Sequence, residues 1–212
     1  LHLLSRRQRQ MCIRDRVSEV VTRVQEGHNV HQHLDLIAGL PYEDYDSFGK
    51  SFCDVYQLRP QQLQLGFLKV LKGSFMYQAA PEYGCVCQSR EPYEVLYTRW
   101  LPYDDVLRLK LVEEMVEVYY NSNQFGKTLR ATEKLFDNPF ALYEALGAFY
   151  DKKGYMDISH TRIRRYEILQ EFLQEYVDEE QMDYYRQLMI CDLYARENMK
   201  TRPAWALSLI HI

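Results

Sequence analysis

The hydrophobic positions in the first third of the chain alternate between helical and strand-like spacing. Valines at every third or fourth position predict a helix over residues 17–26, which Gly27 ends. Residues 30–38 are then predicted as a strand, residues 44–58 as a helix with an apolar stripe, and residues 63–71 as a second strand. Helices and strands that alternate with short connections are typical of βα units, so we expect the strands to lie parallel in a sheet or barrel.

The second half of the chain has mostly helical spacing. Residues 74–101 are rich in turn formers and predict a short helix, a loop and an extended run that ends at Trp100. Beyond Pro102, apolar residues at every third or fourth position predict a long amphipathic helix. Further helices are expected at residues 127–136, 139–153, 161–176 and 179–197. The predicted fold class is α/β plus all-α, with βα units in residues 17–101 and a helical domain in residues 102–206.

Both ends of the chain look foreign to this pattern. The last six residues, LSLIHI at 207–212, match the translation of a transposon-based sequencing adapter, and RRQRQMCIRDR at 6–16 matches its reverse complement with the flanking primer. The alternative is a basic N-terminal arm and a short apolar tail. Because two matches to one reagent occur in opposite orientations, we interpret residues 1–16 and 207–212 as adapter-derived. Residues 17–206 are then expected to be an internal piece of a longer protein.

This interpretation makes the chain more acidic. The whole sequence has a formal net charge of −4, but five arginines and one aspartate lie in residues 1–16, which leaves 21 basic and 29 acidic residues and a net charge of −8. An acidic chain argues against nucleic acid or an anionic membrane as the main partner. No apolar run in the sequence approaches the ~18 residues that span a bilayer, and four scattered cysteines suggest reduced thiols. These features favour a cytoplasmic protein.

Polar residues occupy one face of the first predicted strand. Side chains alternate along a strand, so the apolar residues of 30–38 share one face. The other face carries His31, His33, Asp35 and Ile37. In a parallel barrel this second face points into the lumen, where functional groups gather at the carboxyl ends of the strands. A lumen filled by packing alone would favour Val, Ile and Leu, so two imidazoles and a carboxylate indicate a polar lumen or a bound ligand.

The second predicted strand carries a glycine on one face. Gln64, Gly66, Leu68 and Val70 share that face because side chains alternate along a strand. Gly66 indicates either that another group approaches the backbone closely or that crowding inside the barrel is relieved there. Both interpretations stay open.

The HxH pair on the first strand also opens metal-dependent hydrolysis as an alternative, because imidazole is a good zinc ligand. Such a site needs further ligands from other strands. Between the adapter-like ends the sequence otherwise has His28 and His160, neither at the end of a predicted strand. Cys85 and Cys87 have the wrong spacing for a zinc knuckle and no second pair, so we interpret them as ordinary thiols.

The stretch HLDLIAGLPYEDYDSF at residues 33–48 resembles the fifth strand and following loop of radical S-adenosylmethionine (radical SAM) enzymes. The coproporphyrinogen-oxidase-like and cobalamin-binding groups of that family carry a near-identical D-L-I-x-G-L-P motif followed by acidic residues and a helix. Residues 58–76, LRPQQLQLGFLKVLKGSFM, are similar to the sixth strand and its loop. Residues 92–122 are similar to the start of a helical C-terminal domain in the cobalamin-binding members. Together the resemblance covers most of residues 17–206.

The resemblance implies a fold and a division into domains. Residues 17–101 would be the C-terminal part of a TIM-like radical SAM barrel, and residues 102–206 a helical C-terminal domain. The family assigns no role to His31 or His33, which we expect to line the lower lumen. It assigns no catalytic residue and no metal ligand to this segment.

The resemblance also implies cofactor-binding residues. Asp35 stands in the place of the motif's aspartate and would accept hydrogen bonds from the ribose hydroxyls of S-adenosylmethionine. Ile37 and Gly39 would form the adenine side of the pocket. The positions expected beside the adenine on the sixth strand are Gly66, Phe67 and Leu68.

The cluster-binding motif of the family, C-x-x-x-C-x-x-C, does not occur in this sequence. The ligands of the [4Fe–4S] cluster, and a cobalamin-binding domain, are expected in a preceding N-terminal part. Without the cluster no electron reaches S-adenosylmethionine, so we expect this chain alone to be inactive. The implied cofactors are S-adenosylmethionine, the [4Fe–4S] cluster and cobalamin. The implied partners are a small-molecule substrate and an electron donor such as flavodoxin or ferredoxin.

Two alternatives from other functional classes stay open. One is a non-enzymatic helical interaction module, because the 18 tyrosines and 9 phenylalanines of the chain could form a partner surface. The other is a metal-dependent hydrolase that uses His31 and His33.

Overall fold

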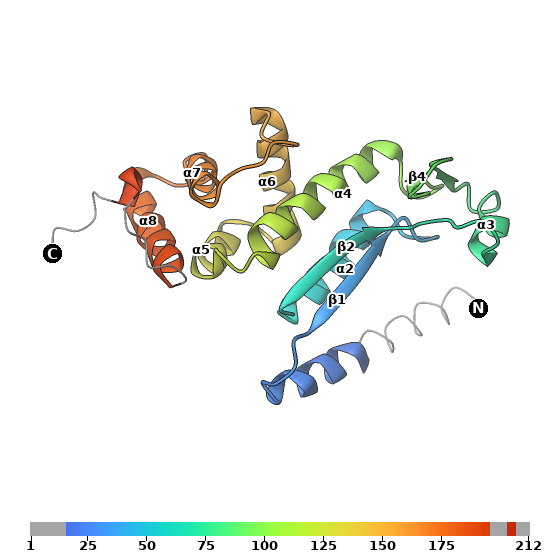
Figure 1. The fold of residues 1–212 in the computed structure, drawn as a ribbon, viewed down its shortest axis with the longest axis horizontal. Helices are drawn as coiled ribbons and strands as arrows, with labels where there is room; N and C mark the ends of the chain where they lie inside the picture. The colour runs from blue at the N-terminus through green and yellow to red at the C-terminus, as the bar shows by residue number, and fades with distance from the viewer. Residues whose placement is uncertain (1–15, 196–202, 207–212) are drawn as a thin grey trace.

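The computed structural model describes residues 16–195 and 203–206, and Figure 1 shows their arrangement. A pair of parallel strands lies between a row of helices and a smaller hairpin unit. Apart from Arg16, the segments interpreted as adapter-derived lie outside the described residues, as do the last two residues of the helix predicted at 179–197. The predicted combination of an α/β part with a helical part is confirmed for this described portion of the chain.

The βα pattern of the N-terminal region is confirmed. A helix over residues 16–26 is followed by β1 (His33–Ala38), α2 (Tyr45–Gln57) and β2 (Gln62–Phe67). β1 and β2 pair in parallel over their whole length. Within the described residues the sheets are the pairs β1–β2 and β3–β4, which do not close into a barrel.

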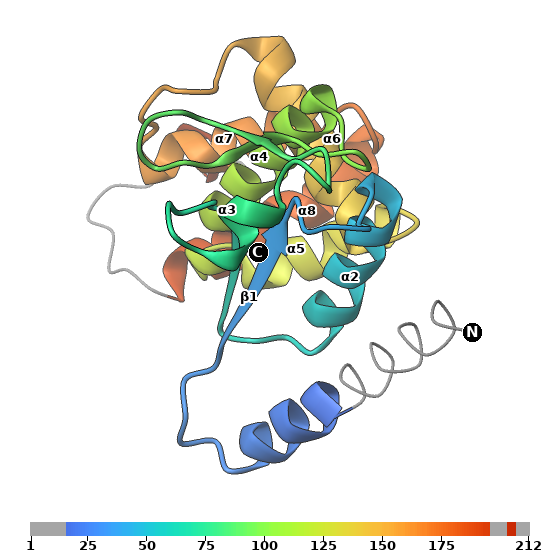
Figure 2. The same cartoon turned by 90° about the vertical axis from the view of Figure 1, so that its right-hand side faces the viewer.

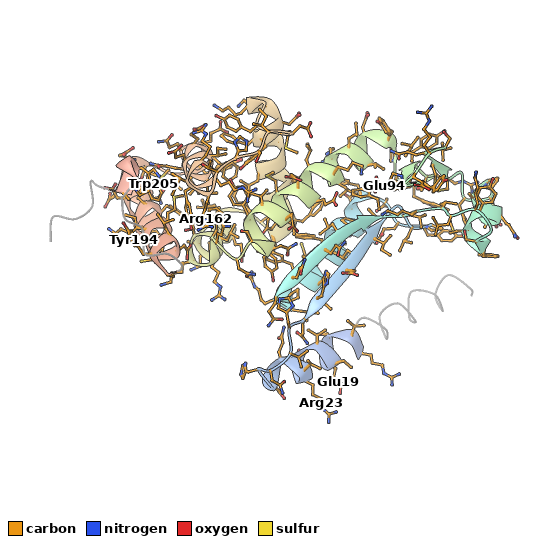
Figure 3. The ribbon with its side chains drawn as sticks, in the orientation of Figure 1. Glu19, Arg23, Glu94, Arg162, Tyr194 and Trp205 are labelled. Carbon is orange, nitrogen blue, oxygen red and sulfur yellow. The ribbon has the colours of Figure 1, made fainter. Side chains whose placement is uncertain are left out.

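The helix over residues 16–26 lies at the start of β1, on the far side from the helical region (Figure 2). Gln32 Nε2 donates a hydrogen bond to Val21 O at 2.9 Å, and Val21 is buried against the rest of the protein. Glu19 and Arg23 are exposed and point away from the molecule (Figure 3). The helix that the valine spacing predicted is therefore present, but of these valines Val21 is buried whereas Val17 and Val20 are 43% and 55% exposed.

Local sequence explains where α2 begins. The Asp44 carboxylate accepts a hydrogen bond from Ser47 N at 2.8 Å, and Ser47 Oγ accepts one from Asp44 N at 2.9 Å. This reciprocal capping box satisfies amide groups that the first turn leaves without helical partners. The buried face of α2 carries the aromatic side chains Phe48, Phe52 and Tyr56.

A small unit follows β2 at its carboxyl end. It consists of α3 (Phe75–Ala79) and a hairpin of β3 (Val86–Cys87) and β4 (Val95–Tyr97). The predicted short helix and extended run are confirmed, whereas β3 lies in what the sequence predicted to be a loop. β2 ends before the predicted residue 71 because the chain beyond Phe67 turns to pair with β4: Val95 N donates to Leu68 O at 2.8 Å.

The helical region matches the predicted helices closely. Its elements are α4 (Tyr103–Met115), the π-helix η1 (Val116–Asn121), α5 (Gly126–Thr132), the 3₁₀ turn η2 (Glu133–Leu135), α6 (Pro139–Lys153), α7 (Arg162–Leu173), α8 (Glu179–Tyr194) and the 3₁₀ turn η3 (Ala204–Ala206). The predicted helix after Pro102 thus changes to π geometry in its last six residues. A mid-helix change of this kind re-aims the side chains that follow it.

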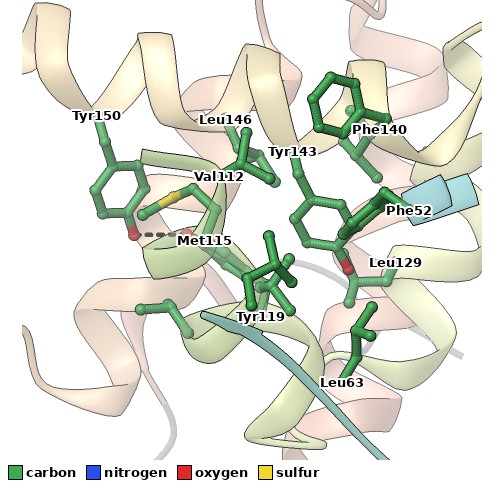
Figure 4. Close-up of a cluster of buried hydrophobic side chains, with 14 of the residues drawn as sticks. Phe52, Leu63, Val112, Met115, Tyr119, Leu129, Phe140, Tyr143, Leu146 and Tyr150 are labelled. Carbon is green, nitrogen blue, oxygen red and sulfur yellow. Dashed lines mark hydrogen bonds between the residues drawn. The ribbon is translucent and has the colours of Figure 1, made fainter. Parts of the chain in front are cut away.

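The part of the core shown in Figure 4 is formed by residues of α2, β2, α4, η1, α5 and α6, and it contains several buried aromatic residues. α4 and α6 approach closely at Gly147, where an added Cβ would lie 2.8 Å from Leu111 Cβ. The buried Tyr119 and Tyr150 hydroxyls are hydrogen-bonded at 2.7 Å, and burial raises the pKa of Tyr150 to about 12. These polar tips are therefore satisfied as neutral phenols inside an otherwise apolar core.

The helical region also supports the α/β part. Tyr56 of α2 donates to Glu133 Oε1 at 2.6 Å, and its hydroxyl lies 3.1 Å from that of the buried Tyr143 in α6. Arg59, just after α2, donates to the same Glu133 carboxylate at 2.9 Å. The two regions are thus joined by a polar network beside the edge-to-face rings of Tyr56 and Tyr143.

Candidate functional site

The two faces of the β1–β2 sheet differ as the alternation predicted. Leu63, Leu65 and Phe67 of β2 are buried on the core face, with half-buried leucines of β1 beside them. The opposite face is open to solvent in the described part of the chain. Its paired positions are His33–Gln62, Asp35–Gln64 and Ile37–Gly66.

Asp35 lies in the middle of this open face. Its side chain is 65% exposed, and its Oδ1 lies 3.1 Å from His33 Nε2. The two residues are neighbours because positions i and i+2 of a strand share a face. An ion pair this exposed contributes at most about 1 kcal/mol to stability. The carboxylate is therefore accessible to a ligand as well as to His33.

Ile37 and Gly66 form a bare patch next to Asp35. Ile37 is 46% exposed although it is a large apolar residue at the end of β1. A Cβ added at Gly66 would meet one atom among the described residues, Leu36 O, at 3.8 Å. Among the described residues nothing crowds this position, and the interpretation that Gly66 relieves crowding inside a complete barrel stays a prediction. The alternative, that another group approaches this backbone closely, also stays a prediction.

The remaining predicted site residues serve the fold through their backbone or their buried side chains. Gly39 has φ +87°, and a Cβ there would lie 2.7 Å from Val95 Cγ1, so both backbone and packing require glycine. The Phe67 side chain points to the core face, not to the face of Asp35. Leu68 N donates to Ala38 O at 2.9 Å. Of the six predicted residues, Asp35, Ile37 and Gly66 are thus brought together on the open face.

The outer edges of the sheet are treated differently. The Asn121 side chain accepts a hydrogen bond from Leu63 N and donates one to Leu63 O, both at 2.9 Å, so it occupies the edge of β2 as a neighbouring strand would. On β1, Gln32 O and Ala38 O accept bonds from β2. Because successive residues of a strand direct these groups to opposite sides, the peptide groups of Asp35 point to the other edge. In the described residues, that edge of β1 carries no further strand.

A cavity of about 660 Å³ lies beside the unpaired edge of β1. It is bounded by Asp35 and Ile37 at the edge, by Val55 of α2 and Leu58 just after it, and by the start of the helix at residues 16–26. Seven of its thirteen lining residues are apolar, and the other six include the carboxylates of Asp35, Glu43 and Asp54, so the cavity is mixed in character. The cavity lies next to the core face of the sheet, on the side of β1 away from β2.

The structure does not bring a metal site together at the histidine pair. His31 lies before β1 and is exposed, whereas His33 is in the strand. Among residues 16–195 and 203–206, no group of three or more His, Cys, Asp or Glu side chains is placed to hold a metal ion. The metal-dependent hydrolase has no support from these residues.

Two features at the carboxyl end of the sheet escaped the sequence reasoning. Tyr42 has φ +70° in the loop after β1, and its ring lies 4.5 Å from that of Trp100. The sulfurs of Cys85 and Cys87 lie 3.6 Å apart on the hairpin. The C-x-C spacing could have indicated this contact, because residues two apart on a strand share a face. The Tyr42 contact had no signal in the local pattern.

Together these elements define a class of protein: a βα unit whose sheet presents a carboxylate on its open face, joined to a helical domain. A family model described as a protein of unknown function (DUF4080) matches residues 81–210, more than half of the chain. The chain belongs to this family, whose domain is associated with radical SAM and cobalamin-binding proteins. No curated protein matches the chain. The match includes the hairpin as well as the helices and begins before the predicted boundary at residue 102.

In the described part of the chain, no helix combines the length and apolar character that a membrane crossing needs.

Proposed function

We propose that this chain is the C-terminal part of a radical SAM enzyme, in which β1 and β2 are consecutive strands of the barrel and the open face belongs to the S-adenosylmethionine pocket. The family association supports this reading, and so does the D-L-I-x-G-L-P motif over residues 35–41. A small-molecule substrate, a cytoplasmic location and an electron donor such as flavodoxin or ferredoxin belong to the same proposal.

The observation that carries the proposal is the parallel β1–β2 sheet, which in the described residues has one solvent-exposed face and, at β1, one unpaired edge. Parallel sheets in proteins are covered on both faces, and an isolated pair of strands is at most marginally stable. Asn121 occupies the outer edge of β2, so further strands add at the edge of β1. The cavity at that edge, with Val55 and Leu58 among its lining residues, offers the space into which a preceding βα unit packs.

The residues of the open face fit the adenosyl part of S-adenosylmethionine. The exposed Asp35 carboxylate accepts hydrogen bonds from two ribose hydroxyls, a geometry suited to a charged acceptor. Ile37 supplies an apolar flank for the adenine ring, and Gly66 leaves its backbone accessible to the ring edge. His33 is placed to orient the Asp35 carboxylate, because its Nε2 lies 3.1 Å from Oδ1.

Bound S-adenosylmethionine supplies a 5′-deoxyadenosyl radical when a [4Fe–4S] cluster reduces it. The described residues contain no group of three cysteines for that cluster, so this segment's task is to bind and orient the nucleoside. The association of the family with cobalamin-binding proteins supports cobalamin as a second cofactor of the enzyme. On this proposal the chain alone is inactive.

The test uses a complete enzyme that contains residues 17–206, purified without oxygen and loaded with its cluster. We expect Asp35→Ala to weaken S-adenosylmethionine binding by about 1.5–3 kcal/mol, roughly ten- to a hundredfold, because a charged acceptor is lost. Asp35→Asn keeps one acceptor and should lose less. Asp46→Ala removes an exposed carboxylate from α2 and serves as the matched control, with unchanged affinity. Equal affinities of the folded wild-type and Asp35→Ala enzymes would refute the assignment.

A further inference from the structure

Two cysteines lie side by side on the hairpin that follows β2. The sulfurs of Cys85 and Cys87 are 3.6 Å apart, and both cysteines are free thiols. They face the same side because they stand two residues apart, with Val86 pointing the other way. A register shift between Val86 and Cys87 marks a bulge in the pairing with β4, which increases the local twist.

The position of this pair places it at the functional end of the sheet. Cys87 pairs with Val95, and Val95 packs on Gly39 at the end of β1. Val95 N also donates to Leu68 O beyond the end of β2. In α/β folds ligands bind at the carboxyl ends of the strands. The Cys85–Cys87 pair therefore lies next to the carboxyl end of the β1–β2 sheet, and β4 connects the two.

The two thiols differ in access. Cys85 is 9% exposed and belongs to the apolar core, whereas Cys87 is half-buried at the surface. Small reagents from solvent therefore reach Cys87 first. Cys85 lies behind it, within one sulfur contact, in the place of a resolving thiol.

We propose that Cys85 and Cys87 form a redox-active dithiol that closes an intramolecular disulfide by exchange with a low-molecular-weight disulfide such as oxidised glutathione. The Cys87 sulfur attacks one sulfur of the small disulfide, which releases one small thiol and forms a mixed disulfide. The Cys85 sulfur then attacks Cys87 Sγ and releases the second small thiol. The dithiol loses two electrons and two protons, and the small disulfide gains both.

The geometry places the Cys85 sulfur 3.6 Å from the Cys87 sulfur that it attacks in the second step. A disulfide bond is about 2.05 Å long, so the sulfurs must approach by roughly 1.5 Å, a change that side-chain rotation supplies. Burial raises the pKa of the Cys85 thiol, and burial together with the neighbouring Cys85 raises the pKa of Cys87 to about 12. The pair is therefore protonated at neutral pH, and exchange should accelerate about tenfold per pH unit from 7 to 9 as thiolate forms.

The test uses the full chain with the other cysteines replaced, Cys12→Ser, Cys53→Ser and Cys191→Ser, so that the pair alone remains. The protein is equilibrated with glutathione buffers of increasing oxidised-to-reduced ratio, quenched with acid, alkylated and weighed by mass spectrometry. We expect Cys85 and Cys87 to lose their reaction with the alkylating reagent together, and we expect no glutathione to remain attached to the protein. Trypsin should then release the peptide over residues 73–90 lighter by two hydrogen atoms.

The matched control is the chain with Cys85→Ser and Cys87→Ser, which keeps Cys12, Cys53 and Cys191. It should gain glutathione on separate cysteines and form no internal bond. In the pair-only background, Cys85→Ser should trap a lasting mixed disulfide on Cys87. Glutathione on both cysteines of the pair at once, or no oxidation at any ratio, would overturn the proposal.

A second measurement leaves both Cys85 and Cys87 in place and so does not depend on the folding of variants that replace them. Phenylarsine oxide binds two neighbouring thiols through one trivalent arsenic, and the pair-only chain should take up one equivalent. Prior oxidation should abolish this uptake, because the same two sulfurs are then joined. Uptake that survives oxidation, or no uptake by the reduced chain, would also contradict the proposal.

Discussion

The helical region and the α/β region use similar aromatic side chains in different settings. In the helical region Phe172 is fully buried and has the rings of Phe136, Phe149 and Tyr176 around it. In the α/β region the sheet has such neighbours on its core face, while Ile37 and Asp35 look outward. The comparison indicates that a sheet with one solvent-exposed face can keep its geometry when the helical region packs against its other face.

Asn121 is the clearest example of this support. A helix residue supplies the donor and the acceptor that a neighbouring strand would supply to Leu63. The π geometry of η1 places this side chain directly after the buried Tyr119 and the half-buried Tyr120. The helical region thus stabilises itself locally, whereas the sheet depends on it from a distance in sequence.

The largest expected change in stability concerns the helical region, whose core packs locally. Phe172→Ala should lower the free energy of unfolding by about 3–5 kcal/mol, because it empties a fully buried site. Phe75→Ala makes the same truncation in α3 at a side chain that is 76% exposed, so it should change stability by less than about 0.5 kcal/mol. Urea denaturation followed by circular dichroism measures both. Similar losses in the two variants would contradict the packing described for α7.

The second prediction tests whether the β1–β2 sheet depends on the Asn121 side chain of the helical region. Asn121→Leu keeps the side-chain volume but leaves Leu63 N–H and C=O without their partners, at a cost of about 2–3 kcal/mol. Amide hydrogen exchange should show loss of protection in β1 and β2, with α6 and α7 retained. Gln64→Ala, on the open face of the same strand, is the control and should leave protection unchanged. Uniform loss across all helices would mean that the regions unfold as one unit.

The sequence predicted most of the fold because its signals are local. Pro139 and Gly154 bound α6 as their usual roles require, and the alternation in β1 sorted its two faces correctly. β3 was missed because two residues are too few to show a period. The site was partly predictable: the motif pointed to Asp35, but whether Gly39 serves a ligand or Val95 depends on a contact 56 positions away in sequence. The same limit hid the ring contact between Tyr42 and Trp100.

The third prediction sharpens the account of the sheet's edges. The N–H groups of Asp35 and Ile37 point to the unpaired edge of β1, whereas those of Leu34 and Leu36 point toward β2. The outward pair should therefore exchange with solvent at least about tenfold faster, a difference of roughly 1.4 kcal/mol in protection. Residue-resolved hydrogen exchange by NMR decides this. Equal protection of all four amides would show that another strand covers the edge in solution.

The smallest expected effect compares the same device in both regions. α2 and α8 each begin with a capping box, Asp44 with Ser47 and Asp178 with Gln181. Asp44→Ala and Asp178→Ala should each cost about 1 kcal/mol at pH 7, because a first-turn amide loses its acceptor. The backbone amide and hydroxyl of Ser47 hold the pKa of Asp44 below its ordinary value of 3.8.

A folded-state pKa below the unfolded one means that this contribution is complete above about pH 5 and is lost as the pH falls through the folded value. The stability gap between the wild-type chain and Asp44→Ala should therefore narrow between pH 4 and pH 2, and salt should weaken it because the carboxylate is exposed. Urea denaturation at pH 7 and pH 2.5, with Asp178→Ala alongside, measures it. A gap that is the same at both pH values would show that Asp44 acts through its shape rather than its charge. In that case packing against α6, rather than the Asp44 carboxylate, would stabilise the start of α2.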